Sequence, residues 1–480
     1  MLVPPAILAL VAAAVFITLL AARIRRQLSL VPSPRLGGPV LGNATAYATD
    51  PAAAIQAADV QCGPVFSIQM LFTQNIWLRS NVLNKFYVNV KEDAWSFGWG
   101  MNLFLHPVVA PGYWDHLRTL VGSLNRCINR SEALDSYAAI ARDEAVTGFA
   151  QWAQTNDTAL FESASVLAHK VIVRCLMGPD FYHHNVYELS DLLHKVEADI
   201  GSIFNFVLPH WVPHPAAKRL WKARDRMQDI FRERLRERAS DPNRWADSED
   251  YVSHTLRDRL TVHLTEFFPA HHTLLMFAAH TSTVASISWT IAEACLLKQC
   301  LIRSPERLAI LRKELLESPS VHSSPLLHAC LKETSRHYSG INMLRLARSP
   351  VTIPDSNVVV PVGAVVSISP YLTHHDARNY YRATEWFPER WLEGGEQFRP
   401  AKSADEVTYL GFGAGSHRCP GEKMAGTIAR EVVGELVRNY DFGWAASGPP
   451  KDFGALDFTK IGSPWLKGDA HVRITPIAKQ

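Results

Sequence analysis

Hydrophobic and polar positions in the middle of the chain predict helices. The segment 217–239 has apolar residues near helical spacing, with Arg and Lys between them. Those apolar positions are Leu220, Met227, Ile230, Phe231 and Leu235. We expect them to face a core and the basic residues to form a solvated face. Contact with anionic lipid is the alternative for that face.

The helical pattern covers most of the body and then changes. Residues 265–298 predict a long apolar helix interrupted by HH and HTST, and 325–338 and 420–438 predict two more helices. From 341 to 400 the spacing favours short strands and turns. No repeat, low-complexity tract or long linker divides residues 46–480. We therefore predict a mainly α (α+β) fold, in which 46–480 forms one large helical domain with a small β-rich part.

The N-terminal segment differs from the body. Residues 1–22 carry no charge, and three arginines follow at once. Roughly 20 apolar residues are enough to span a bilayer. Because the positive charge follows the apolar run, we expect a single-pass transmembrane anchor at 1–26 with the rest of the chain cytosolic, and not a cleaved signal peptide. A buried core helix is the alternative. The stretch 27–45, rich in Pro and Gly, is the expected hinge.

Composition limits the function classes. The chain has 480 residues, 47% hydrophobic and 20% charged, and its net charge of +3 is too small to argue for nucleic acid. The seven cysteines form no CxxC pair and match no zinc or disulfide framework, which suits a reducing compartment.

One cysteine has unusual neighbours. Residues 412–421 are FGAGSHRCPG, in which Gly413, Gly415 and Gly421 permit tight turns and close approach to a flat ligand. Pro420 suits the first position of the helix that follows, so we expect Cys419 at a helix N-terminus, where the helix dipole favours a thiolate.

A thiolate in that setting is suited to haem iron. It is a strong axial ligand that favours O–O cleavage. Phe412 is expected to shield the sulfur, and His417 and Arg418 are cations for haem propionates or for a partner surface. The alternative is an ordinary buried cysteine in a loop.

The string FGAGSHRCPGE resembles the haem-binding loop of cytochromes P450. The family usually has Arg where His417 stands, and its sterol 14α-demethylases have His in a very similar string. The resemblance covers essentially the whole chain. It implies the cytochrome P450 fold and haem b with its iron on Cys419, so that Phe412, Gly413 and Gly415 bind the cofactor.

Further motifs follow the family order. Glu333 and Arg336 match the ExxR of a helix upstream of the cysteine, and Arg390 in WFPERW matches the arginine that completes a buried Glu–Arg–Arg cluster. The ExxR spacing alone is weak, but its order before the cysteine loop is strong. The resemblance implies a structural role, a paired charge cluster on the haem side.

Three other residues match propionate-binding positions of the family. Trp114 and Arg118 match a WxxxR helix, where an i,i+4 spacing points both side chains the same way, and Arg345 in INMLRLA matches an arginine after the ExxR helix. His417 is a further expected donor. An ordinary surface pair is the alternative for Trp114 and Arg118.

The long helix contains FAAHTSTVAS at 277–286. The small Ala278 and Ala279 leave room for oxygen and substrate. By resemblance Thr281, with His280 in place of the usual acid and Ser282 nearby, manages protons during oxygen activation. A threonine that bonds back to its own helix is the alternative.

Some segments depart from the usual pattern. The Pro-Pro after the ExxR helix is absent, and residues 336–341 are RHYSGI. That spacing, with Trp289 in the helix tail, is similar to the sterol 7α-hydroxylase and prostacyclin synthase branch. Thr281 argues for oxygen activation rather than peroxide rearrangement.

The pocket walls expected by position are largely aromatic and aliphatic, namely 95–108, 200–212, 273–282, 341–344 and 458–466.

The resemblance implies a monooxygenase anchored in the endoplasmic reticulum membrane. It would insert one atom of O2 into a lipophilic sterol-, triterpenoid- or other terpenoid-like substrate. Electrons would come from NADPH through a separate cytochrome P450 reductase, because no flavin domain or GxGxxG fingerprint is present. Arg418 and Lys423 are candidates for reductase docking. The alternatives are a haem-thiolate isomerase or dehydratase that needs no reductase, and a haem-binding sensor or carrier.

Overall fold

The computed structural model describes residues 31–37, 43–70, 73–202, 213–296, 305–393, 404–460 and 462–478. The anchor expected at 1–26 lies outside this part of the chain, as does much of the hinge. The described piece of the hinge packs on the body, because Val31 is buried and Ser33 Oγ donates a 3.0 Å hydrogen bond to the Ser67 carbonyl.

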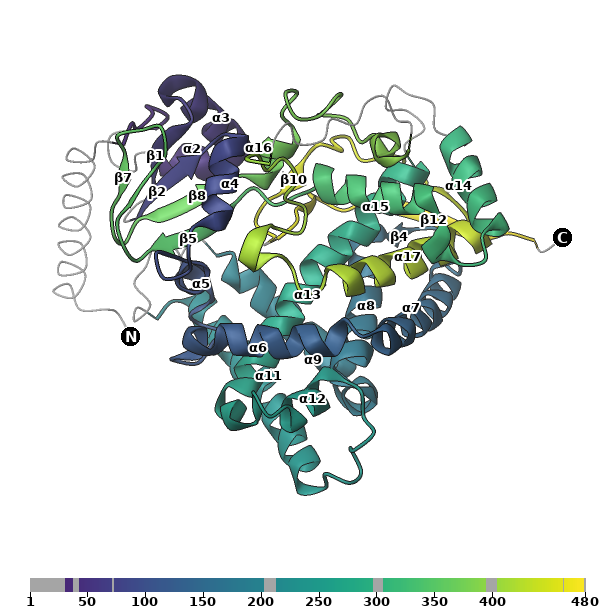
Figure 1. Ribbon diagram of the computed structural model, residues 1–480. Helices are drawn as coiled ribbons and strands as arrows, with labels where there is room; N and C mark the ends of the chain where they lie inside the picture. The colour runs from purple at the N-terminus through teal and green to yellow at the C-terminus, as the bar shows by residue number, and fades with distance from the viewer. Residues whose placement is uncertain are drawn as a thin grey trace, which may run out of the picture.

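Helices make up most of the molecule (Figure 1). The first group is α2 (Ala44–Thr49), α3 (Pro51–Cys62), α4 (Asn81–Asn89), α5 (Phe97–Leu105), α6 (Tyr113–Ile128), α7 (Ser131–Trp152), α8 (Leu160–Ile172) and α9 (Pro179–Ile200). The second group is α11 (Pro215–Ser240), α12 (Tyr251–Arg257), α13 (Phe268–Ile291), α14 (Pro305–Glu317), α15 (Pro325–His337), α16 (Pro370–His374) and α17 (Glu422–Asn439). Short 3-10 or π turns complete them at Val173–Met177, Val262–Phe267, Ala292–Leu296, Val321–Ser323, Pro388–Trp391 and Gly415–His417.

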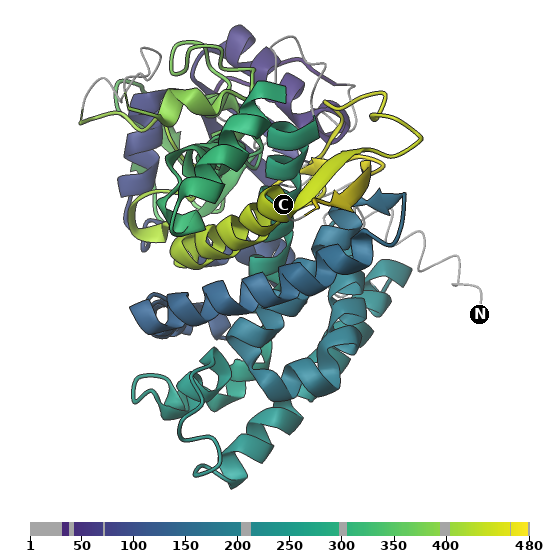
Figure 2. The same cartoon turned by 90° about the vertical axis from the view of Figure 1, so that its right-hand side faces the viewer.

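The described strands form one five-stranded sheet and three smaller ones. One sheet has the order β1-β2-β8-β5-β3, in which only the β2–β8 pair is parallel. Its strands are β1 (Val65–Met70), β2 (Thr73–Leu78), β3 (Trp95–Ser96), β5 (Met343–Ala347) and β8 (Val365–Ile368). The others are β4 (Thr158–Ala159), β6 (Val351–Thr352), β7 (Val359–Val360), β9 (Tyr440–Trp444), β10 (Leu456–Asp457), β11 (Trp465–Leu466) and β12 (His471–Pro476). Figure 2 shows the C-terminal strands beside the blue helices, where β12 pairs with β4.

Helix α13 lies at the centre of the molecule and contacts α8, α11, α15 and α17. In the described part of the chain, the one helix long and apolar enough to cross a membrane is Val262–Ala294, which includes α13. Its most apolar window is 67% buried inside the protein. The apolar length of α13 is therefore explained by its position in the core.

The predicted mainly helical fold with small sheets is confirmed. Helix α11 buries the five apolar residues expected to face the core. Most of its arginines pair at the surface, but the expectation of a wholly solvated basic face is wrong for Arg238. That side chain is fully buried and pairs with Asp180 at 2.5 Å and Asp250 at 2.6 Å. A buried guanidinium is tolerated here because both carboxylates pair with it.

Candidate haem site

The cysteine loop is a tight turn ahead of α17. Gly413 and Gly415 have φ of +70° and +67°, a conformation that favours glycine. The Cys419 amide donates a 2.8 Å hydrogen bond to the Phe412 carbonyl and so closes the loop. Helix α17 begins at Glu422, after Gly421 as its N-cap. Pro420 therefore precedes the cap and does not occupy the first helical position, contrary to expectation.

A cavity of about 580 Å³ separates this loop from α13. Cys419 and Phe412 line it from the loop, and Ala278, Ala279 and Ser282 line it from α13. Other lining residues include Leu124, Ile128, Leu176, Leu275, Thr283, Ser286, Leu331, Tyr338, Met424, Gly462 and Ser463, together with the charged Lys332, Arg418, Glu422 and Arg430. The wall is thus mainly apolar, with hydroxyl groups from α13 and the 462–463 turn and charged side chains from α15, α17 and the cysteine loop.

The Cys419 side chain is exposed, and it lines this cavity. Burial raises the pKa of the Cys419 thiol, and the hydrogen bond from the Gly421 amide offsets this only in part. Burial of the thiol therefore opposes the stabilisation of a thiolate expected at the start of the helix. A neighbouring metal cation is what lowers a thiol pKa in such a setting.

A fully buried charge cluster stands behind the loop. Glu333 accepts hydrogen bonds from Arg336 at 2.8 and 2.9 Å and from Arg390 Nε at 3.1 and 3.2 Å. Arg336 also donates to the carbonyls of His374, Ala383 and Glu385. The three charged side chains have no exposed surface, so their charges are balanced by each other and by hydrogen bonds within the protein, which include those from Phe387 N and Trp391 Nε1 to Glu333.

The expected propionate donors do not line the cavity. Trp114 Nε1 donates to Asn102 Oδ1 at 2.7 Å, and Arg345 is buried, donating to the Val90 carbonyl at 2.9 Å. Arg118 is exposed, and the described residues offer it no hydrogen bond or ion pair. His417 stacks on Phe97, with ring centroids 4.9 Å apart.

His417 also lies beside an acid that the sequence did not single out. Its Nε2 is 2.8 Å from Glu92 Oε2. Burial opposes ionisation of Glu92, yet hydrogen bonds from His417, the Phe97 amide and Ser96 together lower its pKa to about 2. Glu92 therefore gives His417 an anionic partner within the protein.

His280 and Thr281 face α9 and do not line the cavity. Glu197 Oε1 lies 2.7 Å from His280 Nδ1 and accepts a 2.9 Å hydrogen bond from Thr281 Oγ1. Sequence reasoning missed Glu197, although there was a signal. It is an acid on the apolar face of a helix, between the buried Val196 and Ile200. Of the three candidate proton-handling residues, only Ser282 lines the cavity.

Two of the wall segments expected from the sequence, 273–282 and 458–466, contribute residues to the cavity lining. Residues 95–108, 341–344 and 200–202 do not line it, and 203–212 lies outside the described part of the chain. Glycines in two of the segments that do not line the cavity still pack closely on neighbouring segments. A Cβ on Gly100 would lie 3.0 Å from Arg345 Cα, and one on Gly201 would lie 3.4 Å from the Thr459 carbonyl oxygen. The 462–466 turn is fixed to α13 by two indoles. Trp465 Nε1 donates to the Thr281 carbonyl at 3.0 Å, and Trp289 Nε1 donates to the Pro464 carbonyl at 2.8 Å.

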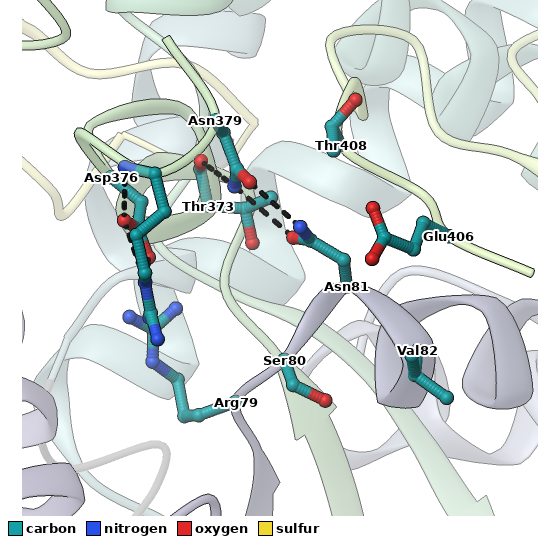
Figure 3. A pocket seen from close by; sticks show the side chains of 10 residues that line it. Arg79, Ser80, Asn81, Val82, Thr373, Asp376, Asn379, Glu406 and Thr408 are labelled. Atoms are coloured by element: carbon teal, nitrogen blue, oxygen red, sulfur yellow. Dashed lines mark hydrogen bonds and ion pairs between the residues drawn. The ribbon is translucent and has the colours of Figure 1, made fainter. Parts of the chain in front are cut away.

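A second, smaller hollow of about 240 Å³ lies at the start of α4 (Figure 3). Several of its polar groups pair with each other: Arg378 with Asp376 at 2.6 Å, and Asn81 with Asn379 through two hydrogen bonds between their side-chain amides. It shares no lining residue with the cavity beside Cys419.

The large cavity fits a haem held by a thiolate. A thiol faces it, the helix opposite presents small residues, and the loop glycines allow a flat group to approach closely. Fold and site together define a haem-thiolate protein. The chain belongs to the cytochrome P450 family, whose model, Cytochrome P450, matches residues 32–461. It is a cytochrome P450 monooxygenase, a class that uses haem, O2 and a small substrate.

Curated relatives agree with this membership. The chain is 53% identical over 451 residues to Cytochrome P450 monooxygenase pynD of Aspergillus niger, covering 92% of each chain. It is 49% identical to Cytochrome P450 monooxygenase pyvB of Aspergillus violaceofuscus, covering 93% of this chain and 90% of that one. Lanosterol 14-alpha demethylase of Homo sapiens is 26% identical, with 84% and 79% covered.

A solved structure shows the same fold. The retinoic acid-bound cyanobacterial CYP120A1 superposes with a TM-score of 0.74 and 17% identity, covering 94% of this chain and 99% of that one.

Proposed function

We propose that Cys419 ligates the iron of haem b and that the enzyme inserts one atom of O2 into a lipophilic substrate. The observation that carries the ligand assignment is the Cys419 thiol at a cavity that Ala278, Ala279 and Ser282 of α13 also line. The bound haem supplies oxygen activation. The other expected contacts with it are Phe412, the loop glycines, and Trp114, Arg118, Arg345 and His417 near the propionates.

The substrate proposal rests on the wall. Its aliphatic side chains favour a sterol-, triterpenoid- or other terpenoid-like molecule, and Ser282, Ser286 and Ser463 offer hydroxyls that orient oxygen atoms on it. The fungal monooxygenases are 53% and 49% identical to this chain, against 26% for the lanosterol demethylases. This difference favours a specialised biosynthetic pathway over housekeeping sterol demethylation.

We assign the delivery of protons for the reaction to His280 and Thr281 of α13. Glu197 is hydrogen-bonded to both His280 and Thr281, which suits a group that holds and passes protons. Burial raises the pKa of Glu197, but the hydrogen bonds and charge of its neighbours outweigh burial and hold that pKa below its ordinary value. Ser282, which follows Thr281 in the sequence, lines the cavity.

Electrons are assigned to NADPH through a separate reductase. Lys423 is exposed beside the cysteine loop, as is Arg418, which pairs with Glu422 at 2.7 Å.

Anchoring by residues 1–26 in the endoplasmic reticulum membrane, with a cytosolic catalytic domain, remains part of the proposal. Deleting those residues should release the protein from membranes, and retention of the truncated chain on membranes would contradict the anchor.

The ligand assignment is tested by the carbon monoxide complex of the reduced protein. The wild type should show the Soret band of a thiolate-ligated haem, and Cys419→Ala should lose it. Cys62→Ala, at a half-buried cysteine away from the cavity, is the matched control and should keep it. If Cys419→Ala keeps the band, the assignment is wrong. Turnover without NADPH and reductase would favour the isomerase or dehydratase alternative.

A further inference from the structure

A continuous line of hydrogen-bonding groups runs from the protein surface to Thr281. His194 Nε2, on α9, lies 3.0 Å from Ser165 Oγ, on α8. The same Oγ lies 3.1 Å from His280 Nε2. His280 Nδ1 then lies 2.7 Å from Glu197 Oε1, which accepts from Thr281 Oγ1 at 2.9 Å. Three helices thus contribute groups to a single line.

Only one end of this line reaches solvent. Ser165 is 0% exposed, His280 1%, Thr281 3% and Glu197 9%, whereas His194 is half-buried. Polar groups this deeply buried are costly unless they are hydrogen-bonded, so the line is held together by its own bonds. A proton from solvent that follows it enters at His194.

At the inner end of the line, one carboxylate oxygen of Glu197 is free to accept a further hydrogen bond. Glu197 Oε2 is buried and has no hydrogen-bond partner among the described residues. An unpaired buried carboxylate oxygen is a site for an ordered water or a transferred proton. The line therefore ends at an acceptor that is not fully occupied.

The other titratable groups nearby are not part of the line. His169, on α8, bonds the Val186 carbonyl through Nε2 at 2.8 Å, and burial lowers its pKa to about 3. Lys460 acts on Glu197 only through its charge and sits over the Trp465 ring, 4.0 Å from the centroid. Ser165 is thus the group that connects buried His280 with a solvent-reaching side chain.

We propose that His194 and Ser165 form the inlet through which protons reach His280 and Thr281. The inference rests on the proposed proton-handling role of His280 and Thr281. A monooxygenase consumes O2, two electrons from an external donor and two protons, places one oxygen atom in the substrate and releases the other as water. His194 takes each proton from solvent and passes one to Ser165 Oγ, whose own proton moves to His280 Nε2. His280 releases the proton on Nδ1 to Glu197, and the groups then reorient.

The first experiment measures proton exchange directly. In the full chain labelled with ¹⁵N-histidine, nuclear magnetic resonance gives the rate at which the His280 ring N–H exchanges with water. Ser165→Ala and His194→Phe should slow this exchange on the order of tenfold or more. Ser288→Ala is the matched control, because Ser288 is a fully buried serine on α13 whose Oγ has no hydrogen-bond partner among the described residues. Unchanged exchange in both inlet variants would overturn the proposal.

The second experiment needs no substrate and no reductase. The haem-loaded protein is reduced with dithionite and mixed with oxygenated buffer in H2O or D2O, and its reoxidation is followed across pH. The inlet variants should reoxidise more slowly, with a larger solvent isotope effect and a shifted pH profile, while thermal stability and the carbon monoxide spectrum stay as in wild type. The variant His280→Gln distinguishes the proposed inlet from the proposed proton-handling role of His280 itself. If it slows reoxidation while the inlet variants do not, the inlet is wrong and the role of His280 stands. If it has no effect, the role of His280 falls.

Discussion

His374 Nε2 accepts a 2.8 Å hydrogen bond from the main-chain amide of Leu410, at the start of the cysteine loop. The ring proton must therefore be on Nδ1, which lies 2.9 Å from the Arg336 carbonyl oxygen. Burial and the charge of Arg336 hold the pKa of His374 well below its ordinary value, so the ring is neutral. The buried Glu333–Arg336 pair and the cysteine loop are thus connected through one imidazole.

Replacing Arg336 should weaken both the fold and the cysteine loop. Arg336→Ala leaves Glu333 with fewer partners in a fully buried site, and we expect a loss of about 3–5 kcal/mol in the free energy of unfolding. Arg336→Lys keeps the charge but not the planar fork, so it should also be destabilised. Urea unfolding and haem content measure the two effects. Arg378→Lys, at a largely exposed ion pair, is the control and should behave as wild type.

Replacing Arg118 should affect haem retention without affecting the fold. Its side chain is exposed and makes no ion pair with described residues, so Arg118→Ala should leave the melting temperature of the haem-free protein unchanged. Loss of a charge-assisted hydrogen bond to a haem propionate should raise the haem dissociation rate about tenfold. Arg118→Lys should raise this rate less than Arg118→Ala does. An unchanged dissociation rate in Arg118→Ala would remove this residue from the haem site.

Gly340 sets the position of a cavity wall. A Cβ there would lie 2.5 Å from the Gly462 carbonyl oxygen, so Gly340→Ala should push the 462–463 turn and change the cavity. We expect a destabilisation of about 1–3 kcal/mol and weaker binding of azole or lipid probes, measured by spectral titration. A Cβ on Gly443 has nothing within 4 Å, so Gly443→Ala should bind these probes like wild type. Equal binding by both variants would contradict the proposed wall.

Buried histidines should make the fold sensitive to acid. His271 bonds Tyr113 and Tyr251 at 2.9 and 2.8 Å, and burial lowers its pKa to about 3. In the unfolded chain its pKa is near 6.5, so below that value the unfolded state binds the extra proton. The contribution of neutral His271 to the free energy of unfolding is complete above about pH 6.5. It is lost as the pH falls toward 3, at up to about 1.4 kcal/mol per pH unit.

The measurement is the urea midpoint between pH 7.5 and 4. His271→Gln keeps hydrogen-bonding groups but does not titrate, so its midpoint should fall less steeply with acid than that of wild type. Equal slopes in the two proteins would show that His271 is not the group responsible.

The sequence predicted the elements whose signals are local. Helix α11, the ExxR pair and the cysteine loop depend on spacing within a few residues, and the structure contains each of them. Contacts between distant segments could not be predicted in this way. Glu197 meets His280 because α9 crosses α13, and no local pattern fixes that crossing. Arg238 has the same helical spacing as its exposed neighbours, and only the approach of Asp180 and Asp250 buries it.

The two indole bonds of the 462–466 turn have a consequence for how such enzymes diverge. Inserting or deleting a residue there would break the bond from Trp465 to Thr281 or that from Trp289 to Pro464. Natural variation at this wall should therefore preserve the length of the turn and change side chains such as Ser463. Enzymes that descend from a common ancestor with this chain would then acquire new substrates here by substitution, while changes in loop length occur elsewhere around the cavity.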